Sequence, residues 1–460
     1  MIVEVQSQTT NNIEIEKIIE GFLNEFDLTQ SPIEVSFRAL LPMLRKTDRH
    51  SHLIHTYPAK LLLHIPYFFL NNNCFSKPGD IVLDPFCGTG TVLLEAILAN
   101  RNAVGADANP LAQLIARVKV RTYSKPDLTR FLDEIVTNIS SKNQSNLPKV
   151  VNLKFWFNES TINNLLQILG SINKIEVEEI RDFFLVCFSN LVKKVSYADP
   201  RISVPVRLNA NRYEENSANY QLVSKRLKDL ESINPLEKFL AICNENIKRV
   251  TEQSAFLQHN NFQSNASIIS HDARNLTENL SSKNKQPNET IDLVITSPPY
   301  AGAQKYIRSS SLSLGWLGLA SSEELRNLDK NNIGRENYTK AERTLAPTNI
   351  IECDQLIEKI KEINPLRAHI VSNYINEMQL ALGESIRVLK KTGYLIIIIG
   401  NNKVCGYEFN TQHYLTEYII SLGLTLKLKL IDDIKSYGLM TKRNKTADII
   451  SREYILIFQK

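Results

Sequence analysis

Two short turns in the sequence combine residue types that could hold a ligand and a reacting group. The first is DPFCGTG, which follows an apolar run, and its Gly88 and Gly90 would let the backbone turn tightly and approach a ligand closely. The second is Ser-Pro-Pro-Tyr at 297–300, which follows the apolar run IDLVIT. Proline fixes its own φ and pushes the preceding residue out of the helical region, so this turn is stiff and extended.

Three aspartates stand at the ends of expected strands. Asp84 opens the glycine turn, where it can accept hydrogen bonds or help to hold the amino-acid portion of a ligand. Asp107 follows the next strand, where an acidic residue can accept both ribose hydroxyls of a nucleoside; alternatively it caps the helix that begins at Pro110. Asp272 follows a third strand and can accept from an adenine amino group, or else forms a cap or turn.

Several ligand and partner classes are disfavoured. The glycine turn lacks the G-x-G-x-x-G spacing of dinucleotide folds and the lysine of a Walker loop, which argues against NAD and ATP. None of the six cysteines forms a C-x-x-C pair, so neither a metal site nor a disulfide framework is expected. No apolar run is long enough to span a bilayer and the N-terminus is not a signal peptide, so we expect a cytoplasmic protein. The net charge of +5 permits a polyanionic partner without demanding one.

Strand and helix patterns alternate, which predicts an α/β fold: a doubly wound, mostly parallel sheet with a helical insertion. The run TGYLIIIIGN predicts a strand buried on both faces, and SREYILIFQK predicts a closing strand at a sheet edge. We expect an N-terminal helical leader over 1–45, a core built from 46–121 and 263–460, and a helical insertion over 122–262 that is a candidate target-recognition region.

Together these stretches resemble the DNA amino-methyltransferases, the N4-cytosine and N6-adenine group, and most of all the site-specific cytosine-N4 enzymes. The resemblance rests on DPFCGTG, GADANP, HDAR, TSPPY and the upstream HTYPAK, and it covers about 45–120 and 265–460. It implies a Rossmann-like class I methyltransferase fold and S-adenosyl-L-methionine as the cofactor. The cofactor-binding residues that it implies are Tyr57, Pro58, Ala59, Lys60, Asp84, Pro85, Phe86, Gly88, Gly90, Asp107 and Asp272.

The resemblance also implies how the second turn works. An exocyclic amine on a base is a poor nucleophile because its lone pair is delocalised into the ring. The Ser297 hydroxyl and the Pro298 carbonyl would accept hydrogen bonds from that amine and localise the lone pair, Pro299 would keep the turn rigid, and Tyr300 would stack on the extruded base. The methyl group would then move in line from sulfonium to nitrogen, with no covalent enzyme intermediate. HTYPAK would help to close over the methionine end of the cofactor, or would be an extended linker.

Serine before Pro-Pro-Tyr is more usual among the cytosine-N4 enzymes, and aspartate among the adenine-N6 enzymes, so the resemblance favours cytosine. It implies double-stranded DNA as the partner and a cognate restriction endonuclease within a restriction-modification system. The alternatives are an adenine-N6 DNA methyltransferase, an RNA or tRNA base-amine methyltransferase, and a non-catalytic nucleic-acid-binding scaffold. The recognition sequence and the oligomeric state stay open.

Candidates for target recognition are 122–262 and 301–370. We expect basic and aromatic residues around the cleft, although each could equally be plain surface charge: Lys193, Lys194, Arg201, Arg207, Lys305, Tyr306, Arg308, Lys442 and Arg443. A second basic cluster would either touch phosphates or form a solvated face: Arg45, Lys46, Arg49, His50 and His52.

Overall fold

The computed structural model describes residues 2–45, 49–58, 60–139, 145–302, 305–321, 323–433 and 451–460. Its centre is an eight-stranded sheet in the order β1-β9-β10-β6-β5-β2-β3-β4, beside which β7 and β8 form a separate two-stranded hairpin. The strands are β1 Ile33–Val35, β2 Ile81–Asp84, β3 Asn102–Ala106, β4 Ala266–Ser270, β5 Ile291–Thr296, β6 Leu389–Ile399, β7 Asn402–Val404, β8 Tyr407–Phe409, β9 Thr425–Asp433 and β10 Arg452–Gln459.

The strand order reverses between β2 and β5, which are parallel neighbours. The chain builds outward from β2 through β3 to β4, and later from β5 to β6 on the other side. In open α/β sheets, ligands bind outside the carboxyl ends of the strands at such a switch point. The expected doubly wound, mostly parallel sheet is therefore confirmed, and its binding position lies above β2 and β5.

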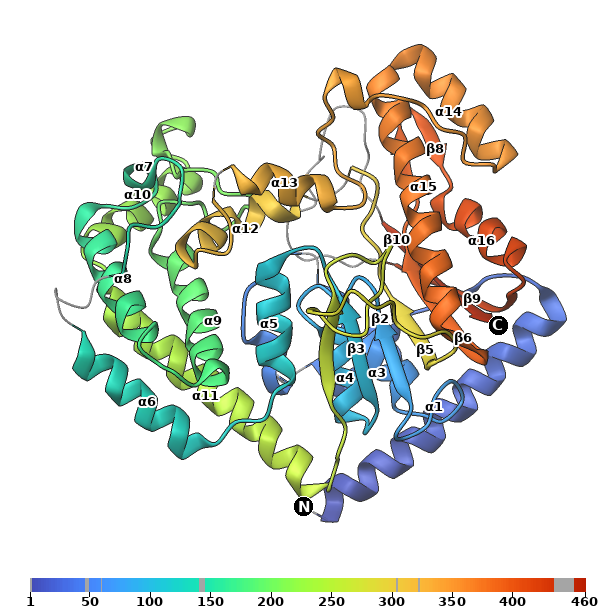
Figure 1. Cartoon of the computed structure of the whole chain (residues 1–460), viewed down its shortest axis with the longest axis horizontal. Helices are drawn as coiled ribbons and strands as arrows, with labels where there is room; N and C mark the ends of the chain where they lie inside the picture. Colours follow the sequence, from blue (N-terminus) through green and yellow to red (C-terminus); the bar gives the residue numbers. More distant parts are fainter. Residues whose placement is uncertain are drawn as a thin grey trace.

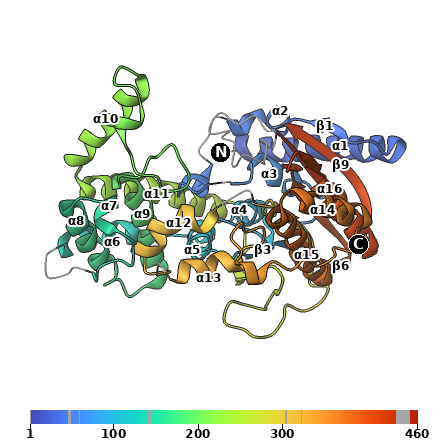
Figure 2. The same ribbon diagram turned by 90° about the horizontal axis from the view of Figure 1, so that it is seen from above.

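Helices cover both faces of the sheet (Figures 1 and 2). They are α1 Ile2–Thr29, α2 Phe37–Leu40, α3 His64–Leu70, α4 Thr91–Leu98, α5 Pro110–Val120, α6 Lys125–Asn138, α7 Leu153–Trp156, α8 Glu159–Ile172, α9 Glu178–Val195, α10 Ala218–Glu231, α11 Pro235–His259, α12 Tyr306–Trp316, α13 Glu324–Asn331, α14 Ile351–Ile363, α15 Pro365–Val388 and α16 Thr411–Ser421.

Strand β6 shows why this sheet needs cover on both sides. Ile396 and Ile398 pack in a core cluster with α1, α3 and α4, whereas Ile397 and Ile399 pack in another with α14, α15 and α16. All four side chains are fully buried. Because successive side chains of a strand point to opposite faces, a run of isoleucines suits a strand covered twice. The strand buried on both faces that TGYLIIIIGN predicts is confirmed.

The position expected for the last strand is wrong. β10 lies inside the sheet, antiparallel to β6 on one side and to β9 on the other. Its residues Ile455, Leu456, Ile457 and Phe458 are fully buried. A central strand pairs its backbone groups on both sides, which an alternating sequence at the chain end does not reveal.

The described part of the expected leader, residues 2–45, contacts the core sheet. β1 pairs in parallel with β9 and adds an edge strand to the main sheet. Ile15, Ile19 and Phe26 of α1 are buried in the same core cluster as α3 and α4. A three-residue strand carries too little pattern to be recognised from sequence, so only its pairing shows that this stretch belongs to the core.

Helices α6 to α11 form a helical unit between β3 and β4, at the left of Figure 1. Its core cluster also takes in Leu111 and Ile115 of α5 and Leu314 and Trp316 of α12. The unit is therefore packed against the helix that follows Asp107 and against the helix that follows the Ser-Pro-Pro-Tyr turn. Its expected role in target recognition stays a prediction.

Candidate active site

The two turns singled out in the sequence begin at neighbouring strand ends. Leu83 of β2 pairs with Val294 of β5, so Asp84 and Thr296 end adjacent parallel strands. The Thr296 hydroxyl donates to Asp84 Oδ1 at 2.7 Å, with both residues buried. Since carboxyl ends of parallel strands share one edge of the sheet, the glycine turn and the Ser-Pro-Pro-Tyr turn face the same space.

The glycine turn requires its glycines for two different reasons. Gly88 has φ +51° and Gly90 has φ +74°, the left-handed region that favours glycine. A Cβ on Gly90 would lie 3.1 Å from the Cβ of Ala116, so protein packing occupies that side. A Cβ on Gly88 would meet nothing within 4 Å. The open side of the turn is therefore at Gly88, where a ligand could approach the backbone.

Asp107 is joined directly to the glycine turn. Its carboxylate accepts from the Gly88 amide at 2.9 Å and from the Asn109 amide at 2.8 Å. Burial raises the pKa of Asp107 to about 6, although these two amides oppose the shift. The cap of α5 is Asn109, whose side chain accepts from the Leu111 amide, so the capping alternative for Asp107 is wrong.

Asn109 also connects Asp107 to the segment upstream of the glycine turn. Its Nδ2 donates to the Tyr57 hydroxyl at 2.9 Å and to the Ser310 hydroxyl of α12 at 3.1 Å. Asn109 is only 1% exposed, so these contacts are sheltered from water. The sequence motifs did not single it out, although Asn followed by Pro at a helix start is a common cap signal.

The HTYPAK segment is tied down at both ends. Lys60 Nζ donates to the carbonyls of His52 and His55, at 3.2 and 2.5 Å. His55 Nε2 lies 2.8 Å from the Ser189 hydroxyl of α9, and Asn190 Oδ1 accepts from the Thr56 amide. Tyr57 and Pro58 are half-buried, and the Tyr57 hydroxyl contacts Asn109, whereas Ala59 lies outside the described residues. These contacts make a fixed wall rather than a plain linker.

At the start of the glycine turn, Asp84 serves the turn itself. Its Oδ1 also accepts from the Phe86 amide at 3.1 Å, and burial raises the pKa of Asp84 to about 7. Phe86 packs against the core cluster that contains α15 and α16. Pro85, between Asp84 and Phe86 in the chain, is buried. Asp84 therefore holds the two turns in register, which is one of the two functions that the sequence leaves open for it.

Asp272 is engaged by a near neighbour. Arg274 Nε lies 2.8 Å from Asp272 Oδ1, Arg274 Nη2 lies 2.9 Å from Oδ2, and the Arg274 amide also donates to Oδ1. The same guanidinium reaches Glu377 of α15 at 2.8 Å. Both oxygens of Asp272 thus take part in a turn and an ion pair, which favours the turn alternative over an adenine contact.

The Ser-Pro-Pro-Tyr turn leaves its serine available. Ser297 is partly exposed, and among the residues that the structure describes its hydroxyl has no hydrogen-bond partner. Pro298 is buried and Pro299 half-buried, which fixes the turn against the sheet. The Tyr300 hydroxyl donates to Glu453 Oε1 of β10 at 3.1 Å, so the ring is anchored by a strand that was expected at the edge of the sheet.

The described residues of the basic cluster at 45–52 form neither a phosphate-binding surface nor a solvated face. Arg49 Nε and His52 Nε2 lie 3.1 and 2.7 Å from Glu95 Oε1 of α4, and the Glu95 side chain is fully buried. His50 packs its ring 5.0 Å from that of Phe256. Arg49 and His52 attach the segment to the helix after the glycine turn, and the buried Glu95 carboxylate compensates the positive charge of Arg49. Lys46 and the Arg45 side chain lie outside the description.

The basic and aromatic candidates after the Ser-Pro-Pro-Tyr turn lie at the start of α12. Tyr306 is its first residue, and Arg308, two residues further along, is exposed. Lys305 Nζ lies 3.7 Å from Glu336 Oε2, so an acid of the protein already faces this cation. Lys442 and Arg443 lie outside the described residues. A contact of these side chains with DNA stays a prediction.

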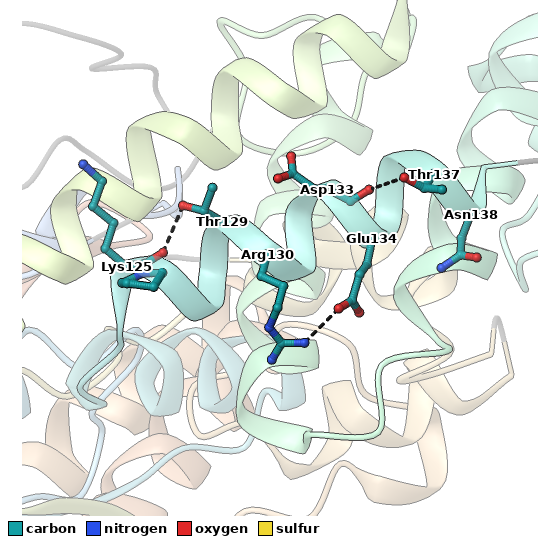
Figure 3. A pocket seen from close by; sticks show the side chains of 8 residues that line it. Lys125, Thr129, Arg130, Asp133, Glu134, Thr137 and Asn138 are labelled. Carbon is teal, nitrogen blue, oxygen red and sulfur yellow. Dashed lines mark hydrogen bonds and ion pairs between the residues drawn. The ribbon is translucent and has the colours of Figure 1, made fainter.

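Outside these turns, a shallow open groove runs along α6 (Figure 3). Residues of this one helix line it, and among them Arg130 and Glu134 form an ion pair at 2.8 Å. The groove shares no residue with the two turns. Within the described ranges, no three His, Cys, Asp or Glu side chains are arranged to hold a metal, and no helix has the length and apolarity to cross a bilayer.

A doubly wound sheet with a glycine turn after its first core strand, an acidic residue after the next, and a proline-stiffened turn across the switch point is a Rossmann-like methyltransferase fold. Residues 34–117 match the family model described as DNA methylase, of the N6/N4 type. Over these residues the chain is similar to the amino-methyltransferases, which use S-adenosyl-L-methionine as their cofactor.

Relatives match over longer stretches. Type II methyltransferase M.MvaI of Kocuria varians is 25% identical over 392 residues, which are 81% of each chain. Type II methyltransferase M.BsoBI of Geobacillus stearothermophilus is 24% identical over 253 residues, 52% of this chain and 48% of its own. The solved structure of a Thermus thermophilus protein complexed with S-adenosyl-L-methionine matches over 41% of this chain and 53% of its own, at 19% identity and a TM-score of 0.20.

Proposed function

We propose that this protein transfers a methyl group from S-adenosyl-L-methionine to the exocyclic amine of a flipped base in double-stranded DNA, with cytosine N4 as the favoured target. The single observation that carries the proposal is the meeting of the glycine turn and the Ser-Pro-Pro-Tyr turn at adjacent strand ends, joined by the Thr296–Asp84 hydrogen bond. One turn can hold a cofactor while the other presents an acceptor to an amine a short distance away.

The residues around the glycine turn fit the cofactor. The open side at Gly88 admits a ligand close to the backbone, and the half-buried Asp107 carboxylate beside it can accept from ribose hydroxyls. Tyr57 and Lys60 stand on the adjoining wall. When bound there, S-adenosyl-L-methionine supplies an electrophilic methyl group carried on a sulfonium. Asp272, already paired with Arg274, is left out of this set.

The second turn would act on the amine. The Ser297 hydroxyl oxygen and the Pro298 carbonyl can accept its two N–H groups, which localises the nitrogen lone pair without any proton being removed beforehand. Because Pro298 and Pro299 fix the backbone, orientation contributes much of the rate. Tyr300, held by Glu453, would stack on the extruded base, since a base must leave the helix to reach such a site.

A comparison of two glycine variants tests the cofactor position. We expect Gly88→Ala to weaken S-adenosyl-L-methionine binding by about tenfold or more, about 1.4 kcal/mol, because its methyl group enters the open side of the turn. Its folding cost should be only about 1–2 kcal/mol, the strain of alanine at positive φ. Gly90→Ala adds the contact with Ala116 and should unfold more readily. Calorimetric titration and chemical denaturation measure both; wild-type affinity in Gly88→Ala would place the cofactor elsewhere.

The relatives that match over most of the chain are Type II methyltransferases, which supports DNA rather than RNA as the substrate. It also supports a place in a restriction-modification system with a cognate restriction endonuclease. Serine at 297 supports cytosine over adenine, because serine before Pro-Pro-Tyr is more usual among cytosine-N4 enzymes.

Two assays test the function. Purified protein with labelled S-adenosyl-L-methionine is offered unmethylated duplex DNA or total tRNA, and label is expected in the DNA alone. Single-molecule sequencing of DNA from a host that expresses the chain should then show N4-methylcytosine in one sequence context, absent with Ser297→Ala. N6-methyladenine would overturn the base assignment, and label in tRNA would overturn the DNA assignment.

A further inference from the structure

Positive charge is concentrated on two segments of the helical unit, 149–157 and 193–213, which we call the basic surface. They lie side by side, since the Tyr197 amide donates to the Trp156 carbonyl at 2.8 Å. Together they contain seven Lys or Arg and one Asp, a local excess of six that exceeds the whole chain's net charge of +5. The seven are Lys149, Lys154, Lys193, Lys194, Arg201, Arg207 and Arg212.

Only one of these cations is neutralised by the described part of the protein. Arg201 forms a fork on Asp199, with Nε 2.9 Å from Oδ1 and Nη2 2.7 Å from Oδ2. The other six have no carboxylate within ion-pair distance among the described residues. Unpaired like charges on one surface repel one another. Binding of a polyanion to such a surface removes this repulsion and is therefore electrostatically favourable.

Arg207 is held in place by rings instead of an acid. Its guanidinium lies 4.7 Å from the Phe155 ring centre and 5.0 Å from the Tyr197 ring centre. An antiparallel bridge between Ala198 and Arg207 fixes the backbone below it. The Phe155 side chain is 45% exposed, which leaves aromatic surface beside the cation. A stacked guanidinium keeps its N–H donors free and loses little entropy when it binds a phosphate.

The basic surface begins at the active site. Ser189 and Asn190 of α9 hold the segment next to Tyr57, and Lys193 follows Ser189 by one helical turn on the same face. At its other border, the Lys149 amide donates to the Gly315 carbonyl in α12, the helix after the Ser-Pro-Pro-Tyr turn. The surface thus extends from the wall beside Tyr57 to the last turn of α12.

We propose that the basic surface binds the phosphate backbone of the substrate duplex, with Lys154, Lys194, Arg207 and Arg212 as phosphate contacts. The inference rests on the proposed function, which makes DNA the substrate. It assigns to the helical unit the positioning of the duplex, while Arg201 shapes the loop that carries Arg207. Phosphate contacts do not depend on the base sequence. The basic surface should therefore govern the affinity for DNA more than the choice of recognition site.

The test measures binding of the full chain to a fluorescein-labelled unmethylated duplex by anisotropy, between about 50 and 200 mM salt. Each phosphate-binding side chain that a variant removes should reduce the slope of log affinity against log salt by about 1. The slope should therefore fall by about 1 in Arg207→Ala, and by about 2 when the exposed pair Lys154→Ala and Lys194→Ala is combined. The decrease should be the same on duplexes of unrelated sequence.

Arg130→Ala is the matched control. Arg130 also lies over an aromatic ring, 4.1 Å from the centre of Phe131, and belongs to the same helical unit, but Glu134 pairs with it. In Figure 1, α6 lies at the other end of this unit from α7. Its salt slope should equal that of the wild type. Wild-type slopes in both Arg207→Ala and the double lysine variant, or an equal decrease in Arg130→Ala, would overturn the assignment.

Two further measurements keep the result interpretable. If thermal unfolding shows that Arg207→Ala does not fold, the salt slope of the double variant Lys154→Ala and Lys194→Ala tests the proposal by itself. If the wild type methylates DNA while every variant keeps the wild-type slope, the basic surface is wrong and the proposed function stands. If the wild type methylates no DNA in any duplex, the proposed function itself fails.

Discussion

Ser297→Ala should reduce methyl transfer by about 100- to 1000-fold, the usual effect of removing one hydrogen-bonding group that acts on the reacting centre. The hydroxyl is partly exposed and has no partner within the described structure, so its removal leaves no buried group unsatisfied. Binding of S-adenosyl-L-methionine should stay within about twofold, because the cofactor contacts belong to the other turn. Single-turnover transfer of labelled methyl and calorimetric titration measure the two quantities.

Ser311→Ala is the matched control for this variant. The Ser311 hydroxyl donates to the Arg308 carbonyl within α12, a short distance along the chain from the turn. Its removal should leave methyl transfer unchanged. Full activity in Ser297→Ala would mean that another acceptor polarises the amine, and the assignment of the Ser-Pro-Pro-Tyr turn as the catalytic element would then be lost.

Asp107→Ala should weaken S-adenosyl-L-methionine binding by about 10- to 100-fold. A hydrogen bond to a charged group is worth about 1.5–3 kcal/mol, and the variant removes the carboxylate that would accept from the ribose. It also releases the Gly88 amide, which donates to Asp107 at 2.9 Å, so the glycine turn loses a brace. Calorimetric titration measures the affinity, and Asp133→Asn on the exposed surface of α6 is the control.

The pH dependence of binding follows from the same group. The pKa of Asp107 is raised by burial to about 6, and the ionised carboxylate is the better acceptor, so affinity should fall as pH drops below about 6. The contribution of Asp107 to folding stability changes with pH in the opposite direction. Between the unfolded value of 3.8 and about 6 the folded chain holds the extra proton, so stability from this group falls as pH rises.

Asp107→Asn separates this effect from other titrations. The variant cannot ionise at 107, so its affinity should lose the step near pH 6 while the Asp84 carboxyl still titrates. A step of unchanged size in Asp107→Asn would show that another group controls binding, and the ribose role of Asp107 would have to be abandoned.

Much of the core was predictable because its signals are local. The apolar run before DPFCGTG and the glycines within it specify a strand and a turn whatever the rest of the chain does. The alternation of TGYLIIIIGN with helical segments identified a sheet covered on both faces, which β6 confirms. The placement of the two turns at one edge follows from parallel strands.

Other features were out of reach because they depend on distant partners. Arg49 and His52 form hydrogen bonds with the buried Glu95, which lies 46 and 43 residues further along the chain. No sequence pattern near 49–52 predicts that partner. The sequence also left a cap as the alternative to a ligand contact for Asp107, and the structure gives the cap to Asn109. The anchoring of Tyr300 by Glu453 required β10 to be central.

Local sequence is enough to identify the residues that could do chemistry and to place each of them at the end of a strand, since backbone preferences of Gly, Pro and apolar runs act over a few residues. Folding in three dimensions fixes which strand ends are neighbours, which charges are paired within the protein, and where the unpaired charges gather. Those outcomes depend on long-range pairing of strands and packing of helices, such as β2 on β5 and α9 against His55. Local sequence patterns do not specify such contacts between residues that are far apart in the chain.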